Sequence, residues 1–160
     1  MGLAITRDGN VASTRVGNLW LMATGSRPIP DDTWREYLEH GAASVVAGGP
    51  FHGVLTWAPT HGPSTSQRRM LTGEFAEAIR LDAQRRVAVV SESAFARGTM
   101  TAINWFAKKN LAAFSPSEID LAFDWLEEDI EFDREQAQHA LQQIIRAVEV
   151  PERKSGSLRR

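Results

Sequence analysis

Short apolar runs alternate with longer amphipathic stretches along the chain, most clearly between residues 85 and 126. A β-branched run at residues 87–90 ends in the polar turn Ser-Glu-Ser at residues 91–93, and a helical pattern follows. A second short apolar run, Leu111–Phe114, precedes an amphipathic helix that starts at Ser115. This order predicts a β-α-β-α unit of minimum length, in which a small sheet is covered by helices.

Turn signals and apolar runs predict four further strands. The dipeptides Asp8-Gly9 and Gly17-Asn18 favour tight turns, so the chain is expected to begin with strands joined by short connections. The predicted strands cover residues 3–7, 11–16, 19–23 and 54–58.

Capping residues and apolar stripes predict the helices. Asp31 caps the first helix, which Gly41 is expected to end or loosen. Ser64 stands at a capping-box spacing before a glutamine, Ser93 caps the third helix, and Ser-Pro-Ser-Glu at residues 115–118 starts the fourth. Their apolar stripes are, in order, Trp34, Tyr37 and Leu38; Leu71, Phe75, Ala78 and Ile79; Phe95, Ala102, Ile103 and Phe106; and Ile119, Ala122, Phe123 and Leu126.

A last helix extends the predicted domain at its carboxyl end. It covers residues 133–149 and carries a broad apolar stripe, which either covers the core or faces another copy of the chain. Pro151 is expected to stop it, and residues 151–160 are expected to form a disordered basic tail. We therefore predict a single α/β domain over residues 1–150.

Composition and charge narrow the classes of protein. The 160 residues include no cysteine, which excludes disulfides, thiol catalysis and thiolate metal sites. The formal net charge of −2 and the acidic stretch at residues 118–135 argue against nucleic-acid binding. The first residues lack the apolar core of a signal peptide, and no run approaches the roughly 20 apolar residues of a membrane helix. A cytoplasmic protein without a membrane span is expected.

Five tryptophans are many for a chain of this length. They are Trp20, Trp34, Trp57, Trp105 and Trp125, and they are spread over different predicted elements. We predict that they fill one core, and an aromatic-lined ligand pocket is the alternative.

Four sets of short motifs, together with the alternation of strands and helices, point to a known family. They are Gln67-Arg68-Arg69; Arg86-Val87-Ala88-Val89-Val90 with Ser93; Arg97-Gly98 with Trp105-Phe106; and Phe114-Ser115-Pro116 with Trp125-Leu126. In these features the chain resembles the STAS domain of bacterial anti-sigma-factor antagonists, in its SpoIIAA-like branch, which is related in shape to CRAL-TRIO lipid-binding domains. The resemblance covers about residues 11–128 and implies a mixed β-sheet covered by helices, and non-enzymatic regulation through protein contacts.

The resemblance also implies a phosphorylation site at the start of the helix that follows a central strand. That position falls at Ser64, Thr65 or Ser66, although the family's usual Asp-Ser pair is absent there. Backbone N–H groups and the helix dipole would receive an anion at this place. The alternative is that Ser64 is only a helix cap and that its two neighbours are solvated.

A second group of polar residues is predicted to form a partner-binding surface with the start of that helix. Glu92 and Ser93 follow a strand, and Arg97 lies one turn into the next helix, where it can pair with Glu92 or bind an anion. With Arg68 and Arg69 they form the predicted surface, for which a kinase or a sigma-factor regulator is the expected type of partner. A simple cap and a surface ion pair are the alternative interpretation.

No pattern of residues indicates catalysis, a metal or a cofactor. The four histidines, His40, His52, His61 and His139, lack the spacing of a metal site. A triad of Ser93, His61 and Glu92 would lack the nucleophile elbow of hydrolases.

Three functions remain open from the sequence. The leading prediction is a non-catalytic cytoplasmic regulatory module that binds a protein partner and is modulated by phosphorylation. The alternatives are a carrier of a small apolar or anionic ligand, held between sheet and helices, and a scaffold that self-associates through its last helix.

Overall fold

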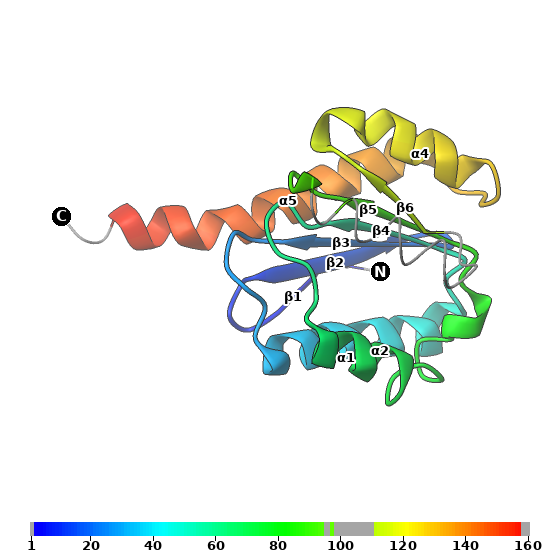
Figure 1. Cartoon of the computed structure of the whole chain (residues 1–160), viewed down its shortest axis with the longest axis horizontal. Helices are drawn as coiled ribbons and strands as arrows, with labels where there is room; N and C mark the ends of the chain where they lie inside the picture. Colours follow the sequence, from blue (N-terminus) through cyan, green and yellow to red (C-terminus); the bar gives the residue numbers. More distant parts are fainter. Residues whose placement is uncertain (1, 95–96, 98–110, 158–160) are drawn as a thin grey trace.

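A six-stranded mixed sheet forms the centre of the molecule (Figure 1). The computed structural model describes residues 2–94, 97 and 111–157. Its strands are β1 Ala4–Ile5, β2 Val11–Val16, β3 Leu19–Thr24, β4 Gly53–Trp57, β5 Arg86–Val90 and β6 Leu111–Phe114. They lie side by side in chain order; β1, β2 and β3 are antiparallel, whereas β3 to β6 run parallel. The predicted α/β class with a mixed sheet is confirmed.

Helices cover both faces of this sheet. In Figure 1, α1 (Asp31–Gly48) and α2 (Thr65–Thr72) lie below the sheet, and α4 (Ile119–Glu127) and α5 (Arg134–Ser157) lie above it. Two short 3₁₀ helices, η1 (Leu81–Ala83) and η2 (Pro116–Glu118), complete the described elements. Side chains alternate between faces along a strand, so Leu19 and Leu21 of β3 join the core under α5, while Trp20 and Met22 join the core against α1.

The first two strands form the expected hairpin, and Asp8 anchors its turn. The Asp8 carboxylate accepts hydrogen bonds from the Thr6 hydroxyl at 2.8 Å, the Asn10 backbone N–H at 3.0 Å and the Thr33 hydroxyl at 2.7 Å. Burial raises the pKa of Asp8, but these hydrogen bonds and the charge of Arg27 outweigh it, so the pKa lies below its ordinary value. Because Thr33 belongs to α1, the carboxylate also ties the turn to that helix.

Arg15 of β2, which is far from the helix end in sequence, caps the carboxyl end of α1. Its guanidinium donates to the carbonyls of Ser44 at 3.1 Å, Gly48 at 2.9 Å and Gly49 at 2.6 Å, and it lies 4.7 Å from the centre of the Phe51 ring. The last turn of α1 contains no basic residue of its own. Arg15 therefore supplies both the donors and the positive charge that a helix end favours.

Gly41 does not end α1, contrary to the sequence-based prediction. The helix continues to Gly48, and Gly41 is the point where the Trp20 ring packs against it. A Cβ atom at Gly41 would lie 2.5 Å from both Cζ2 and Cη2 of Trp20. The Trp20 ring is itself stacked between Tyr37 at 4.6 Å and Phe51 at 4.9 Å. The glycine therefore makes room for an aromatic stack and does not break the helix.

Other helix boundaries also differ from the predictions. Pro30, not Asp31, occupies the cap position of α1. The helix α2 ends at Thr72, before the predicted stripe is complete, although Phe75 and Ile79 beyond it are buried. Pro151 does not stop α5, which runs to Ser157, so the expected disordered tail is helical up to that residue. The third predicted stripe, at residues 95–106, lies outside the described residues.

The helix α5 covers the core of its own chain. It begins after Asp133, as predicted, and packs against β2 and β3. The predicted stripe is confirmed: Ala137, Ala140, Leu141, Ile144 and Val148 are buried, and Ile145 packs beside them. Between the two interpretations of this stripe, the structure supports the one in which it covers the core.

Candidate functional site

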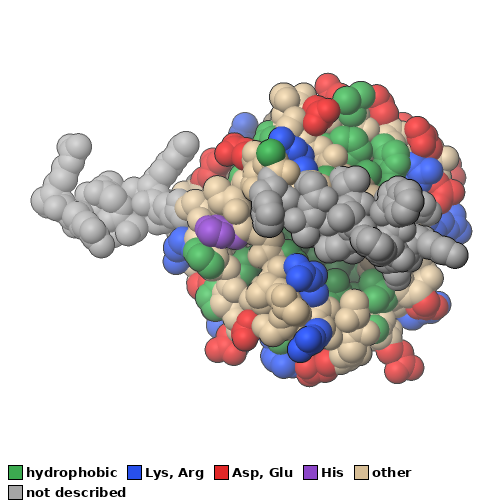
Figure 2. All heavy atoms as spheres, in the orientation of Figure 1, with side chains coloured by type: hydrophobic (Ala, Val, Ile, Leu, Met, Phe, Trp, Pro, Cys, Tyr) green, Lys and Arg blue, Asp and Glu red, His purple; other side chains and the backbone are tan. Residues whose placement is uncertain are grey.

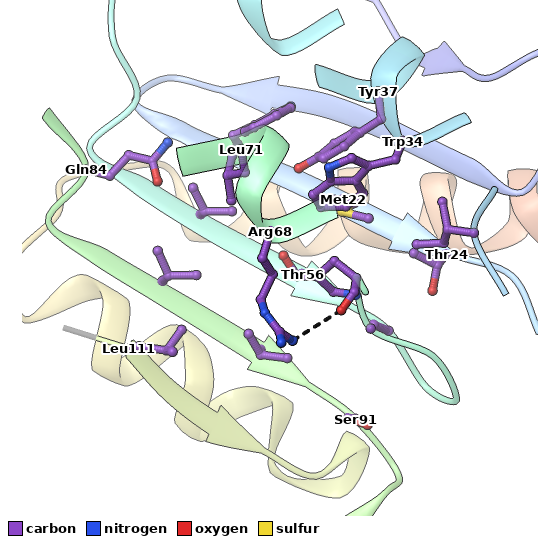
Figure 3. A pocket seen from close by; sticks show the side chains of 18 of the residues that line it. Met22, Thr24, Trp34, Tyr37, Thr56, Arg68, Leu71, Gln84, Ser91 and Leu111 are labelled. Atoms are coloured by element: carbon purple, nitrogen blue, oxygen red, sulfur yellow. Dashed lines mark hydrogen bonds between the residues drawn. The ribbon is translucent and has the colours of Figure 1, made fainter. Parts of the chain in front are cut away.

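A cavity of about 290 Å³ lies between the sheet and the layer of α1 and α2 (Figure 3). Its floor consists of side chains from neighbouring strands that stand in register on the same face. The side chains form three successive rows, which are Trp20, Val54, Val87 and Leu111; Met22, Thr56 and Val89; and Thr24, Ala58 and Ser91. Parallel pairing aligns the first two rows, and the third lies one residue beyond the last paired positions. The cavity is thus a direct product of parallel register on β3 to β6.

Aromatic side chains form one wall of the cavity. Trp34 and Tyr37 come from α1 and meet at 5.2 Å between ring centres, and Trp20 rises from β3 to stack on Tyr37. The indole N–H of Trp34 donates to the Gln67 carbonyl at 2.9 Å, which fixes its ring against α2. Burial raises the pKa of Tyr37, so this phenol is neutral at physiological pH.

The prediction that the tryptophans fill one core is therefore wrong. Trp20 and Trp34 lie on the cavity side of the sheet, whereas Trp57 and Trp125 pack against the core under α4 and α5. Trp105 lies outside the described residues. The alternative interpretation, an aromatic-lined pocket, describes Trp20 and Trp34 correctly.

One buried hydroxyl in the cavity lining lacks a hydrogen-bond partner. Thr24 lies at the end of β3 with only 2% of its surface exposed, and its Oγ1 makes no hydrogen bond among the described residues. Buried polar atoms are normally paired, so such an atom in a cavity wall marks a place where a bound molecule or a water would be stabilised. Sequence analysis missed Thr24; the only available signal was its alternation with Trp20 and Met22 on one face of the strand.

The charged side chains of the lining are both arginines. Arg68 from α2 and Arg85 line the cavity together with the imidazole of His61, and no Asp or Glu does so among the described residues. Figure 3 shows Arg68 extending from α2 across the cavity near Thr56, with a hydrogen bond drawn to a neighbouring oxygen. That oxygen is the Pro63 carbonyl at 3.3 Å, and the Arg68 guanidinium also donates to the Thr65 hydroxyl at 3.2 Å.

The predicted phosphorylation site lies beside this arginine. Ser64 forms the predicted capping box, because its Oγ accepts from the Gln67 N–H at 3.2 Å and the Gln67 side chain accepts from the Ser64 N–H at 3.0 Å. Ser64, Thr65 and Ser66 are exposed, and the Ser64 and Ser66 hydroxyls share a hydrogen bond at 3.0 Å. The capping role of Ser64 is confirmed, and phosphorylation stays a prediction.

The predicted partner-binding residues come together only in part. The Glu92 N–H donates to the Pro59 carbonyl at 3.1 Å, so the segments that leave β4 and β5 meet at one edge of the sheet. The Arg97 guanidinium donates to the Ser91 carbonyl at 2.7 Å. The Arg97 backbone N–H bonds to the Ser93 carbonyl, as expected for a helix that starts there. Arg69 is exposed on α2 and lies outside the cavity lining.

The described residues offer no metal site or membrane span. Among them, no group of three His, Asp or Glu side chains is placed to hold a metal ion. His52 and His61 stand at opposite ends of β4, which separates them by the length of the strand. Within the same part of the chain, every helix is too short or too polar to cross a bilayer.

Comparison with protein-family models, with curated proteins and with solved structures finds no match to this chain. The STAS resemblance therefore stays a prediction, and any function must be argued from the cavity and its surroundings.

Proposed function

We propose that this protein is a non-catalytic module that binds a small, mostly apolar molecule in the cavity between the sheet and the helices α1 and α2. The observation that carries the proposal is the cavity itself, which is bounded by Trp20, Trp34 and Tyr37 and by three register rows of the sheet. Concave apolar sites with a few polar groups are the usual form of small-ligand sites. The unpaired hydroxyl of Thr24 adds a polar group that a ligand would satisfy.

The opposite face of the sheet provides an internal comparison. There, Leu21, Leu55 and Ala88 are fully buried under α4 and α5, and none of them lines the cavity. On the other face, Trp20, Met22 and Val54 are also nearly buried, but they border the cavity. This cavity favours a binding role for the face under α1 and α2.

Native mass spectrometry of freshly purified protein tests the proposal, together with titration of 1-octanol by ligand-observed NMR. Val89→Phe places a larger side chain on the cavity floor and should abolish octanol binding. Val46→Phe adds the same ring at a site on α1 that is 88% exposed, and should leave binding unchanged. A clean apo mass, together with no octanol binding to the parent chain, would exclude the ligand-binding role.

Regulation of a cytoplasmic partner through the start of α2 is a second candidate function. It is favoured by the exposure of Ser64, Thr65 and Ser66 directly beside the cavity, to which Arg68 links them through its bond to Thr65. Incubation with kinases of a bacterial lysate, followed by intact-mass measurement, checks for phosphate on these residues. An unchanged mass would remove the phosphoswitch and leave ligand binding untouched.

A further inference from the structure

We infer that the ligand of this cavity is a small amphipathic monocarboxylate, whose carboxylate is bound by Arg68 and whose apolar body lies along the aromatic wall. This inference rests on the proposed ligand-binding function and adds the charge and the size of the ligand. Three separate observations carry it: the pairing of Arg68, the charge balance of the lining, and the volume of the cavity.

Arg68 has no acidic partner in the part of the chain that the structure describes, whereas four other arginines form ion pairs. Arg35, Arg80, Arg86 and Arg134 each have a carboxylate oxygen within 4 Å. Arg68 has none among the described residues, and its two recorded bonds, at 3.2 and 3.3 Å, go to neutral oxygens. A guanidinium carries five N–H donors in a planar fork, so the group retains donors for a carboxylate.

The charged side chains of the cavity lining favour an anion. Arg68 and Arg85 line the cavity, and no carboxylate does among the described residues. On the face of the molecule shown in Figure 2, acidic side chains lie mostly around the periphery, and Lys or Arg side chains lie both there and near the centre. Arg68 is half-buried at the border of a mostly apolar cavity, where its attraction for a carboxylate is stronger than it would be in open water.

The volume indicates the size class of the ligand. A cavity of about 290 Å³ lies at the lower end of the range of small-molecule sites, which suits a ligand of about ten non-hydrogen atoms. An eight-carbon carboxylate has that size. The fork of one arginine matches the two oxygens of one planar carboxylate in a bidentate pair.

The test compares three eight-carbon probes by isothermal titration calorimetry at pH 7.5: octanoate, 1-octanol and octylammonium. We expect octanoate to bind at least about tenfold more tightly than octanol, as one charge-assisted hydrogen bond would provide. Octylammonium should bind most weakly. In Arg68→Met the preference for octanoate over octanol should disappear while octanol affinity stays the same, and Arg68→Lys should retain part of it.

Arg69→Met is the matched control, because it removes the same charge from the next residue of α2 outside the cavity. It should keep the full preference for octanoate. Arg85→Met tests the other arginine of the lining, and loss of the preference there instead of in Arg68→Met would overturn the assignment to Arg68.

The outcomes separate the two levels of the argument. Equal affinity for octanoate and octanol would retain the ligand-binding function and refute the carboxylate. Failure of all three probes to bind would refute both. If Arg68→Met does not fold, the Arg68→Lys result decides: an octanoate preference identical to that of the parent after the fork is lost would contradict recognition by the guanidinium.

Discussion

Replacement of Gly41 by alanine should destabilise the protein, although alanine is the better helix former. In an open helix position the change would stabilise by about 1 kcal/mol. Here the new Cβ would lie 2.5 Å from two atoms of the Trp20 ring, and that ring is held between Tyr37 and Phe51. Forced overpacking costs about 1–3 kcal/mol, and this contact belongs at the upper end, so we expect a net loss of about 1–2 kcal/mol.

Urea unfolding followed by tryptophan fluorescence measures this loss, and thermal unfolding should show a Tm lower by about 2–4 °C for each kcal/mol in a chain of this size. Val46→Ala is the control in the same helix, since Val46 is exposed, and it should stabilise slightly. Near-ultraviolet circular dichroism would report the displaced Trp20 ring.

A double-mutant cycle with Trp20→Phe tests the cause. Phenylalanine lacks the outer ring of the indole, so in that background Gly41→Ala should become neutral or stabilising. The expected coupling between the two positions is about 1–3 kcal/mol. An equal loss from Gly41→Ala in both backgrounds, or no loss in the parent chain, would refute the packing argument.

Three further outcomes are expected. Arg15→Met should lower the free energy of unfolding by about 2–3 kcal/mol in urea titrations, because carbonyls at the end of α1 lose a charged donor, and an unchanged midpoint would show that water replaces it. The pKa of Asp8 is lowered in the folded state, so its stabilising effect is present above its unfolded pKa, near 4, and is lost as pH falls through the lower folded value. Asp8→Asn should therefore reduce stability at pH 7 and nearly match the parent at pH 2, and parallel pH profiles would contradict this. Thr24→Val should raise the thermal stability of the ligand-free protein by about 1 kcal/mol, since it removes an unpaired buried hydroxyl, and any loss of stability would mean that a water already satisfies it.

Local signals in the sequence predicted the features that local physics decides. The capping boxes at Ser64 and Ser115 involve residues three apart, so their spacing is sufficient to find them, and both are confirmed. The apolar stripe of α5 was also predicted correctly, because apolar residues at a spacing of about 3.6 indicate a helix whatever the helix packs against.

Features that depend on distant contacts were not predictable in the same way. Gly41 was interpreted as a helix end, because nothing nearby in the sequence reveals that the ring of Trp20, from strand β3, packs against it. The cap on the carboxyl end of α1 comes from Arg15, which precedes the helix in the chain and belongs to a strand. An aromatic-lined pocket was only an alternative in the sequence analysis, and its floor was not predicted, because the floor appears only when parallel register brings Met22, Thr56 and Val89 into one row.

The position of α5 has a consequence for how the chain folds during synthesis. Most neighbours in the sheet are also neighbours along the chain, so the strands can pair in the order in which they leave the ribosome. The helix that closes the core over β2 and β3 is nevertheless the last described element to emerge. Until α5 docks, the apolar side chains of β2 and β3 that it covers stay exposed to water, and exposed surface of this kind promotes aggregation. Docking of α5 is therefore the step that closes this part of the core.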